Sequence, residues 1–237
     1  MAQLVFIHGP GAGGCADAFV NQLKHFPGSV APTLPGHLQG EPHMMDVARL
    51  TEWVRGWLWA QGLNKDLVLV GFTLGACIAF QYGLDYPDEV KGIVGTTCAV
   101  RPKGRLPETF EMRLRATQTK EGYEEWLNFQ RSVLFLTEPT LREHLIECHR
   151  KVGPMAQHYD RLAIAAFDVR ERIATLKPKL MLLRGLKDPD NPPEFEKEIH
   201  DAVPGSLYFK LPEAGHFPLT ELPEETNALI ERFLATL

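Results

Sequence analysis

The chain of 237 residues lacks an excess of basic side chains. It carries 25 Lys and Arg against 30 Asp and Glu, which gives a formal net charge of −5. Proteins that bind nucleic acids usually present a basic surface to the phosphates, so the charge balance gives that class of function no support. Internal repeats and low-complexity tracts are also missing, and the length allows a sizeable core. We expect a globular protein without a nucleic-acid partner.

Cysteine is scarce, with four residues and no C-x-x-C spacing. Cys77 and Cys98 lie in apolar runs, which favours reduced thiols buried in a core. His144, Cys148 and His149 share one helical stretch, but the sequence shows no partner pair of ligand residues elsewhere. We therefore predict no metal site.

The chain also lacks a recognisable leader and an unbroken membrane segment. No basic residue precedes the apolar run Leu4–Ile7, so we predict no targeting signal. One uncharged run, residues 67–84, reaches the length of a membrane helix. Gly71, Thr73 and Gly75 interrupt this run, and a buried strand, turn and helix explain it better. We expect a soluble, cytoplasmic protein that does not enter a membrane.

Short apolar runs alternate with longer helical patterns along most of the chain. This alternation is typical of βαβ units and a parallel sheet. The fold class we predict is α/β, with a doubly wound, mostly parallel sheet of about six strands. The strands are expected at residues 4–7, 29–31, 67–70, 92–95, 180–183 and 207–211, and the main helices at about 15–25, 46–62, 76 onward, 193–202 and from about 222.

The pattern changes between residues 101 and 177. This stretch contains several helical segments of mixed charge, such as the one around Trp126 and Phe129, and no good strand. We predict a helical cap at 101–177, inserted into an α/β core made of residues 1–100 and 178–237. Open parallel sheets bind ligands at their carboxyl edge, which is the edge that such a cap would cover.

Three polar residues follow predicted strands. Thr73 stands at the centre of Gly71-Phe72-Thr73-Leu74-Gly75, between an apolar strand and an apolar helix, which is the strand–turn–helix context of a nucleophile elbow. Asp188 lies four residues after Arg184, with Asp190 as an alternative acid, and His216 lies in the loop after the last strand. Because the carboxyl ends of parallel strands share one edge of a sheet, these loops can meet there.

The chain resembles the α/β-hydrolase superfamily, in its branch of small esterases and enol-lactonases. The resemblance covers nearly the whole chain and rests on five segments, namely His8-Gly9, Leu34-Pro35-Gly36-His37, the Gly71–Gly75 elbow, Gly185–Asp188 and Ala214-Gly215-His216. Members usually have two strands ahead of the His-Gly strand, and this chain begins on that strand. The resemblance implies a fold without those two strands and an enzyme without a cofactor.

By this resemblance Thr73 takes the position of the nucleophile, Asp188 that of the acid and His216 that of the base. Developing negative charge on the substrate oxygen would be met by the backbone N–H of Leu74 and by a second donor from the turn after His8-Gly9. His8 itself is expected to stabilise that turn.

Two residues depart from the family pattern. A β-branched threonine resists the positive φ of the elbow and adds about 1–3 kcal/mol of strain there. Pro10 follows the His-Gly pair at the position that commonly supplies the second oxyanion donor, and proline has no N–H. Gly11 or Gly13 would then have to supply it.

The predicted function is cleavage of a small carboxylic ester, thioester or lactone through a Thr-His-Asp triad. Two alternatives stay open. His216 could act as a general base in a non-hydrolytic reaction, with Thr73 only donating a hydrogen bond, or the protein could bind a small molecule without turning it over. Thr73 could also serve simply as a helix N-cap. The sequence leaves the substrate and the oligomeric state open.

Overall fold

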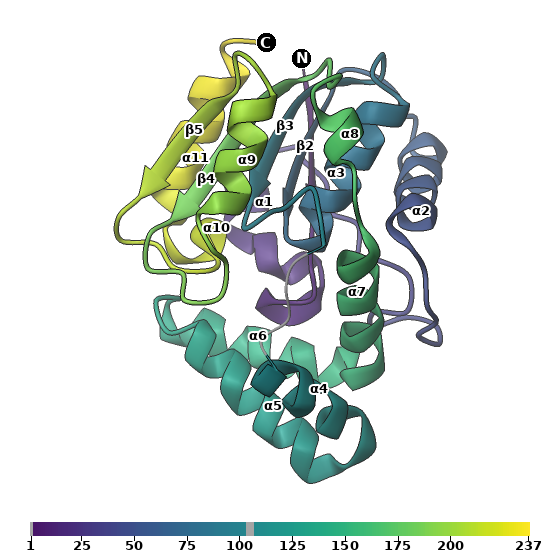
Figure 1. Ribbon diagram of the computed structural model, residues 1–237, viewed down its shortest axis with the longest axis vertical. Helices are drawn as coiled ribbons and strands as arrows, with labels where there is room; N and C mark the ends of the chain where they lie inside the picture. Colours follow the sequence, from purple (N-terminus) through teal and green to yellow (C-terminus); the bar gives the residue numbers. More distant parts are fainter. Residues whose placement is uncertain (1, 103–106) are drawn as a thin grey trace.

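A five-stranded parallel sheet forms the centre of the protein. The computed structural model describes residues 2–102 and 107–237 (Figure 1). Within them the sheet has the order β1-β2-β3-β4-β5, and every neighbouring pair is parallel. This confirms the predicted α/β class. The strands are β1 (Gln3–Ile7), β2 (Leu67–Phe72), β3 (Val90–Thr96), β4 (Lys179–Gly185) and β5 (Leu207–Leu211).

The strand expected at residues 29–31 is reduced to a single bridge, so the described sheet has five strands where about six were predicted. Val30 pairs in parallel with Val5, and its backbone exchanges hydrogen bonds with Phe6 and Leu4. Pro27 and Pro32 bracket the segment, and proline cannot donate to a strand ladder. The bridge lies on the opposite side of β1 from β2. The winding direction therefore reverses at β1, and ligands bind at such reversal points.

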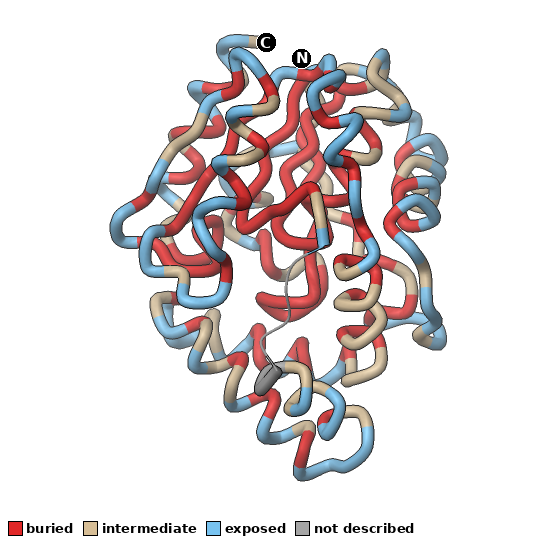
Figure 2. Tube along the Cα trace, in the orientation of Figure 1, coloured by how far each residue is buried: buried red, intermediate tan, exposed pale blue. Residues whose placement is uncertain are grey.

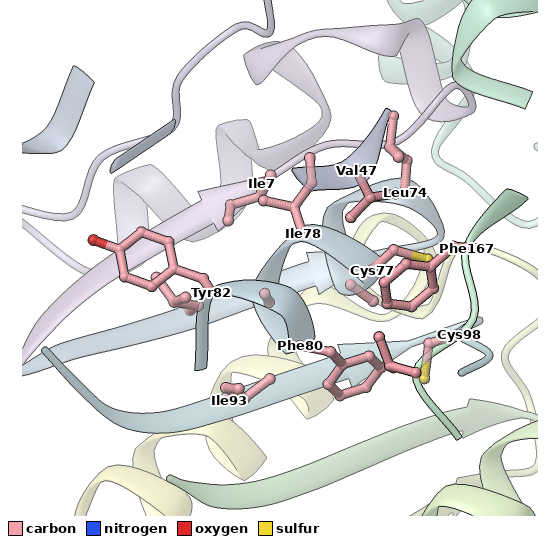
Figure 3. Close-up of a cluster of buried hydrophobic side chains, with 14 of the residues drawn as sticks. Ile7, Val47, Leu74, Cys77, Ile78, Phe80, Tyr82, Ile93, Cys98 and Phe167 are labelled. Atoms are coloured by element: carbon pink, nitrogen blue, oxygen red, sulfur yellow. The ribbon is translucent and has the colours of Figure 1, made fainter. Parts of the chain in front are cut away.

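Helices cover both faces of the sheet, as a doubly wound sheet requires. Alternate residues of each strand enter two separate hydrophobic clusters. Figure 3 shows the first, where Ile7 of β1 lies close to Ile78 of α3, and Ile93 of β3 lies toward Phe80 of the same helix. The covering helices are α2 (Val47–Ala60), α3 (Leu74–Asp85), α8 (Arg170–Ile173) and α9 (Glu194–Ala202) on this face, and α1 (Val20–His25), α10 (Pro218–Glu221) and α11 (Pro223–Leu234) on the other.

The run at residues 67–84 is a buried strand, turn and helix. It forms β2, the Thr73 turn and most of α3, and Figure 2 shows the strands as the buried centre of the molecule. In the part of the chain that the structure describes, no helix combines the length and the apolar character needed to cross a bilayer.

Between β3 and β4 the described residues form helices and no strand. They are α4 (Pro107–Gln118), α5 (Lys120–Val133), α6 (Pro139–Val152), α7 (Pro154–Ala166) and the short α8. We call α4–α7 the helical insertion. It lies beyond the carboxyl ends of the strands (Figure 1), and α6 contacts the turn that follows β1. The predicted domain limits at 101 and 177 stay a prediction, and residues 103–106 lie outside the described residues.

The helix expected at about 15–25 is regular only in its second half. Two 3₁₀ turns, Ala12–Gly14 and Ala16–Phe19, precede α1. Gly13 and Gly14 have φ angles of 89° and 61°, outside the right-handed helical region, so the chain turns tightly before the helix begins. By contrast, the helix expected at 46–62 forms as α2, and the Asp46 side chain caps it by accepting the N–H of Arg49 at 2.7 Å.

Candidate active site

Thr73 occupies a strained turn between β2 and α3. Its φ is 49° and its ψ is −113°, a conformation that costs a β-branched residue about 1–3 kcal/mol. Gly71 and Gly75 on either side of the turn leave no room for a Cβ atom. A Cβ on Gly75 would stand 1.9 Å from the Ile7 carbonyl oxygen, and one on Gly71 would stand 2.3 Å from the Gly75 carbonyl carbon. The motif glycines therefore let the elbow sit directly against the end of β1.

The Thr73 hydroxyl points toward the turn after β1. A Cβ on Gly9 would lie 1.8 Å from Thr73 Oγ1, so the hydroxyl fills the space that this glycine leaves. Thr73 Oγ1 is buried and has no hydrogen-bond partner among the described residues. Although Thr73 stands at the N-cap position of α3, its side chain accepts no capping bond. A capping role does not explain this residue.

Asp188 and His216 form a buried hydrogen-bonded pair. His216 Nδ1 lies 2.9 Å from Asp188 Oδ1, and the same oxygen accepts the N–H groups of Asp190 and Asn191. Arg184 Nη1 stands 3.5 Å from the other carboxylate oxygen. Burial alone would raise the pKa of Asp188, but the hydrogen bond and charge of His216 hold it below its usual value. This geometry favours Asp188 over the exposed Asp190 as the partner of the histidine.

Thr73 and His216 are both attached to the carboxyl end of β3. The Thr73 N–H donates to the Thr96 carbonyl at 3.1 Å, and the Thr97 hydroxyl donates to the His216 carbonyl at 2.6 Å. No hydrogen bond joins Thr73 Oγ1 to His216, because Thr73 Oγ1 bonds to no described residue. The structure thus joins two of the three predicted triad residues and brings the third to the same strand end without the final bond. Such bonds often form only when substrate is present.

Glu221 binds the loop that carries His216, a contact that the sequence did not predict. Its carboxylate accepts the Gly215 N–H at 2.5 Å and the Phe217 N–H at 3.3 Å, so it binds the backbone on both sides of His216. Burial raises the pKa of Glu221 to about 7. The residue belongs to the one-turn helix α10, and nothing in the local sequence predicts that its carboxylate bonds to the backbone of the preceding loop.

The elbow and the turn after β1 differ in whether they offer a free backbone N–H group to an oxyanion. Leu74 is the first residue of α3, so its N–H has no partner within the helix and is available to a ligand. In the turn after β1, Pro10 has no N–H, and Gly13 donates its own to His149 Nε2 at 3.0 Å. Gly13 is therefore not free to act, and Gly11 remains. Gly11 lies against the Phe217 ring, where a Cβ would stand 2.3 Å from a ring carbon.

His8 holds the same turn in place. Its Nε2 accepts the Leu34 N–H at 2.9 Å, which leaves Nδ1 to donate to the Gly9 carbonyl at 3.1 Å. Burial lowers the pKa of His8 well below its usual value, so the ring is neutral. These bonds fit the predicted role in stabilising the turn.

Arg161 is a second residue that the sequence analysis missed. It lies on α7 of the helical insertion, and its Nε is buried with no hydrogen-bond partner among the described residues. Burial lowers the pKa of Arg161, while the nearby carboxylates of Asp190 and Asp160 favour its charged form. No ion pair to it forms in the described part of the chain, since Asp160 bonds to His37 Nε2 at 3.0 Å instead. Arg161 therefore lies near the loop of Asp188 and Asp190 without an ion-pair partner among the described residues, and it can bind an anion there.

The chain is similar in sequence to known hydrolases. The sequence model described as "Alpha/beta hydrolase family" matches residues 4–229. Among curated proteins, the "Putative carbamate hydrolase RutD" of Shigella flexneri is 24% identical over 207 residues, covering 81% of this chain and 74% of that protein.

Solved structures give the same picture of the fold. A thermophilic esterase from Thermogutta terrifontis superposes with a TM-score of 0.84 at 22% identity, covering 100% of this chain and 90% of its own. The enol-lactonase from Burkholderia xenovorans LB400 has a TM-score of 0.84 at 17% identity, covering 99% and 92%. At these identities the likeness shows the fold.

Proposed function

The chain belongs to the alpha/beta hydrolase family, and we propose that it hydrolyses a small carboxylic ester, thioester or lactone through Thr73, His216 and Asp188, without a cofactor. The observation that carries this proposal is the buried Asp188–His216 hydrogen bond at the same strand end as the elbow. A carboxylate bound to Nδ1 fixes the imidazole tautomer and leaves Nε2 to accept a proton.

In the proposed reaction Thr73 Oγ1 attacks the substrate carbonyl carbon while His216 Nε2 accepts the hydroxyl proton. This requires the hydroxyl to rotate from Gly9 toward His216. The negative oxygen of the tetrahedral intermediate would be held by the N–H groups of Leu74 and Gly11. The histidine then returns the proton to the leaving group, and a water molecule activated by the same nitrogen releases the acyl group from Thr73.

One observation favours a second reaction on the same residues. Because Thr73 Oγ1 faces Gly9 and bonds to nothing described, His216 could act as a general base directly on a bound molecule, with Thr73 contributing only a hydrogen bond. The two reactions differ in whether an acyl-threonine forms.

A fluorophosphonate probe distinguishes these mechanisms. We expect an adduct on Thr73, found by peptide mass spectrometry, and its loss in His216→Ala. The matched control is His43→Ala, which changes an exposed histidine outside the site. Hydrolysis that survives Thr73→Ala but not His216→Ala would support the second reaction instead. Absence of both an adduct and turnover of small esters and lactones above the uncatalysed rate would contradict both reactions and leave a binding protein.

We propose further that the substrate carries an anionic group that pairs with Arg161. Burying the Nε of Arg161 without a hydrogen-bond partner is costly, and a substrate carboxylate would offset that cost. The similar esterase from Thermogutta terrifontis has been solved with malate bound, which is a dicarboxylate.

Arg161→Gln tests whether the substrate is anionic. The assay compares two nitrophenyl esters, one with an uncharged butyryl group and one whose succinyl group carries a free carboxylate. A hydrogen bond to a charged group contributes about 1.5–3 kcal/mol, so we expect KM for the succinyl ester to rise about 10- to 100-fold. The butyryl ester should be little affected. Arg170→Gln, at an exposed arginine, is the control. Equal losses on both esters would refute anion recognition and leave the catalytic proposal standing.

A further inference from the structure

Four side chains with metal-binding atoms meet away from the candidate active site. Cys15 Sγ, an Asp17 carboxylate oxygen and Cys148 Sγ lie within 4.8 Å of one another. His144 Nε2 stands 2.7 Å from Asp17 Oδ2 and 3.7 Å from Cys148 Sγ, and Cys148 Sγ stands 3.6 Å from Asp17 Oδ2. The two cysteines are buried, whereas Asp17 and His144 are about half exposed.

The separations to Cys148 are close to those of a tetrahedral zinc site, whereas His144 lies outside the group formed by Cys15, Asp17 and Cys148 and would have to move toward Cys15. Zinc binds sulfur at about 2.3 Å and nitrogen or oxygen at about 2.0–2.2 Å. A tetrahedron with those bonds has sulfur–nitrogen and sulfur–oxygen edges of about 3.6 Å and a nitrogen–oxygen edge of about 3.4 Å. The two observed edges to Cys148 match. The edge between His144 and Asp17 is shorter because these groups now bond to each other, and it needs to open by less than 1 Å.

We propose that Cys15, Asp17, His144 and Cys148 form a four-coordinate site for a divalent cation of the zinc type. On binding, the two thiols release their protons to solvent, and the neutral imidazole donates through Nε2. The ligand set of two thiolates, one imidazole and one carboxylate suits zinc better than magnesium or calcium, which prefer oxygen ligands alone.

The site is built as two chelating pairs. Cys15 and Asp17 are two residues apart in the turn after β1, and His144 and Cys148 are one helical turn apart on the same face of α6. The next residue of α6, His149, already accepts the Gly13 N–H. The cation would thus fasten the helical insertion to the turn that carries Gly11. The exposed edge formed by Asp17 and His144 provides the path of entry.

Cobalt substitution tests the site directly. The full-length protein is reduced, stripped with a chelator and titrated with Co²⁺, followed by Zn²⁺. We expect one Co²⁺ per chain, a sulfur-to-cobalt charge-transfer band, strong tetrahedral d–d bands and full displacement by Zn²⁺. At a hundredfold excess over Kd, Zn²⁺ should raise the Tm by roughly 5 °C.

Variants locate the ligands. Cys148→Ser should remove the charge-transfer intensity and the thermal shift, and the matched control Cys77→Ser should keep both. Should Cys148→Ser fail to fold, the exposed His144→Gln answers the same question against His43→Gln. Wild-type protein without a charge-transfer band overturns the proposal. So does equal cobalt binding by His144→Gln and wild type, or a Cys15–Cys148 disulfide that persists under reductant and leaves no cobalt bound.

Discussion

The two halves of the candidate site differ in how completely their polar atoms are bonded. In the base half, Asp188 holds His216 through one carboxylate oxygen that also accepts two backbone N–H groups, and Glu221 binds the chain on both sides of the histidine. In the nucleophile half, the Thr73 hydroxyl has no described partner, and Pro10 has no N–H to donate. The candidate base His216 is therefore held in place without a substrate, whereas the hydroxyl of the candidate nucleophile Thr73 would still have to rotate toward it.

Asp188→Asn should break the base half and give the largest effect. An asparagine amide can stabilise the wrong imidazole tautomer and supplies no negative charge, so we expect kcat for ester hydrolysis to fall about 10³- to 10⁴-fold. Steady-state kinetics with Asp190→Asn as the control measures this. A larger loss in Asp190→Asn than in Asp188→Asn would make Asp190 the acid and reverse the assignment.

Glu221→Gln, in the base half, should change how the free energy of unfolding depends on pH. Because burial raises the pKa of Glu221 to about 7, the folded protein holds its proton more tightly than the unfolded chain. The free energy of unfolding of the wild type should therefore fall by about 3 kcal/mol between about pH 4.5 and pH 7, and change no further above that.

The variant should lack this decline, as urea unfolding at several pH values would reveal. Glu224→Gln, at an exposed glutamate of α11, is the control. Parallel pH profiles for Glu221→Gln and the wild type would show that Glu221 does not titrate in this range.

Thr73→Ser should improve the nucleophile half, with the smallest effect of the three. Removing the methyl group leaves a hydroxyl that rotates freely about χ1 and relieves part of the strain at φ 49°. We expect kcat/KM to rise about tenfold, which corresponds to about 1.4 kcal/mol of the barrier. No gain in the ester assay, in a variant of unchanged Tm, would locate the weakness in the oxyanion donors and not in the attacking oxygen.

The sequence predicts the parts of the site that local pattern encodes. The apolar strand, the glycines at 71 and 75 and the following helix together specify the elbow, because close backbone contact excludes other residues there. Asp188 and His216 are likewise located in loops after later strands, and their proposed roles come from the resemblance to the hydrolase family.

The sequence does not predict residues whose role depends on contacts with distant parts of the chain. Arg161 and Glu221 look like ordinary helical charges until folding buries them, and the Gly13 N–H is taken by His149, which lies 136 residues away. The bridge at Val30 shows the same limit in the fold, since two prolines shorten a strand that hydrophobicity alone favours.

Thr73 and His216 are hydrogen-bonded to the neighbouring residues Thr96 and Thr97, and this affects how substitutions can change the specificity of such a protein. Both candidate reacting groups are hydrogen-bonded to the end of β3 in the core, and among the described residues no hydrogen bond ties either of them to the helical insertion that carries Arg161. Substitutions in α4–α7 can therefore alter which molecule is recognised while the spacing of the reacting atoms is inherited unchanged. New specificity on this scaffold does not require the chemistry to be rebuilt.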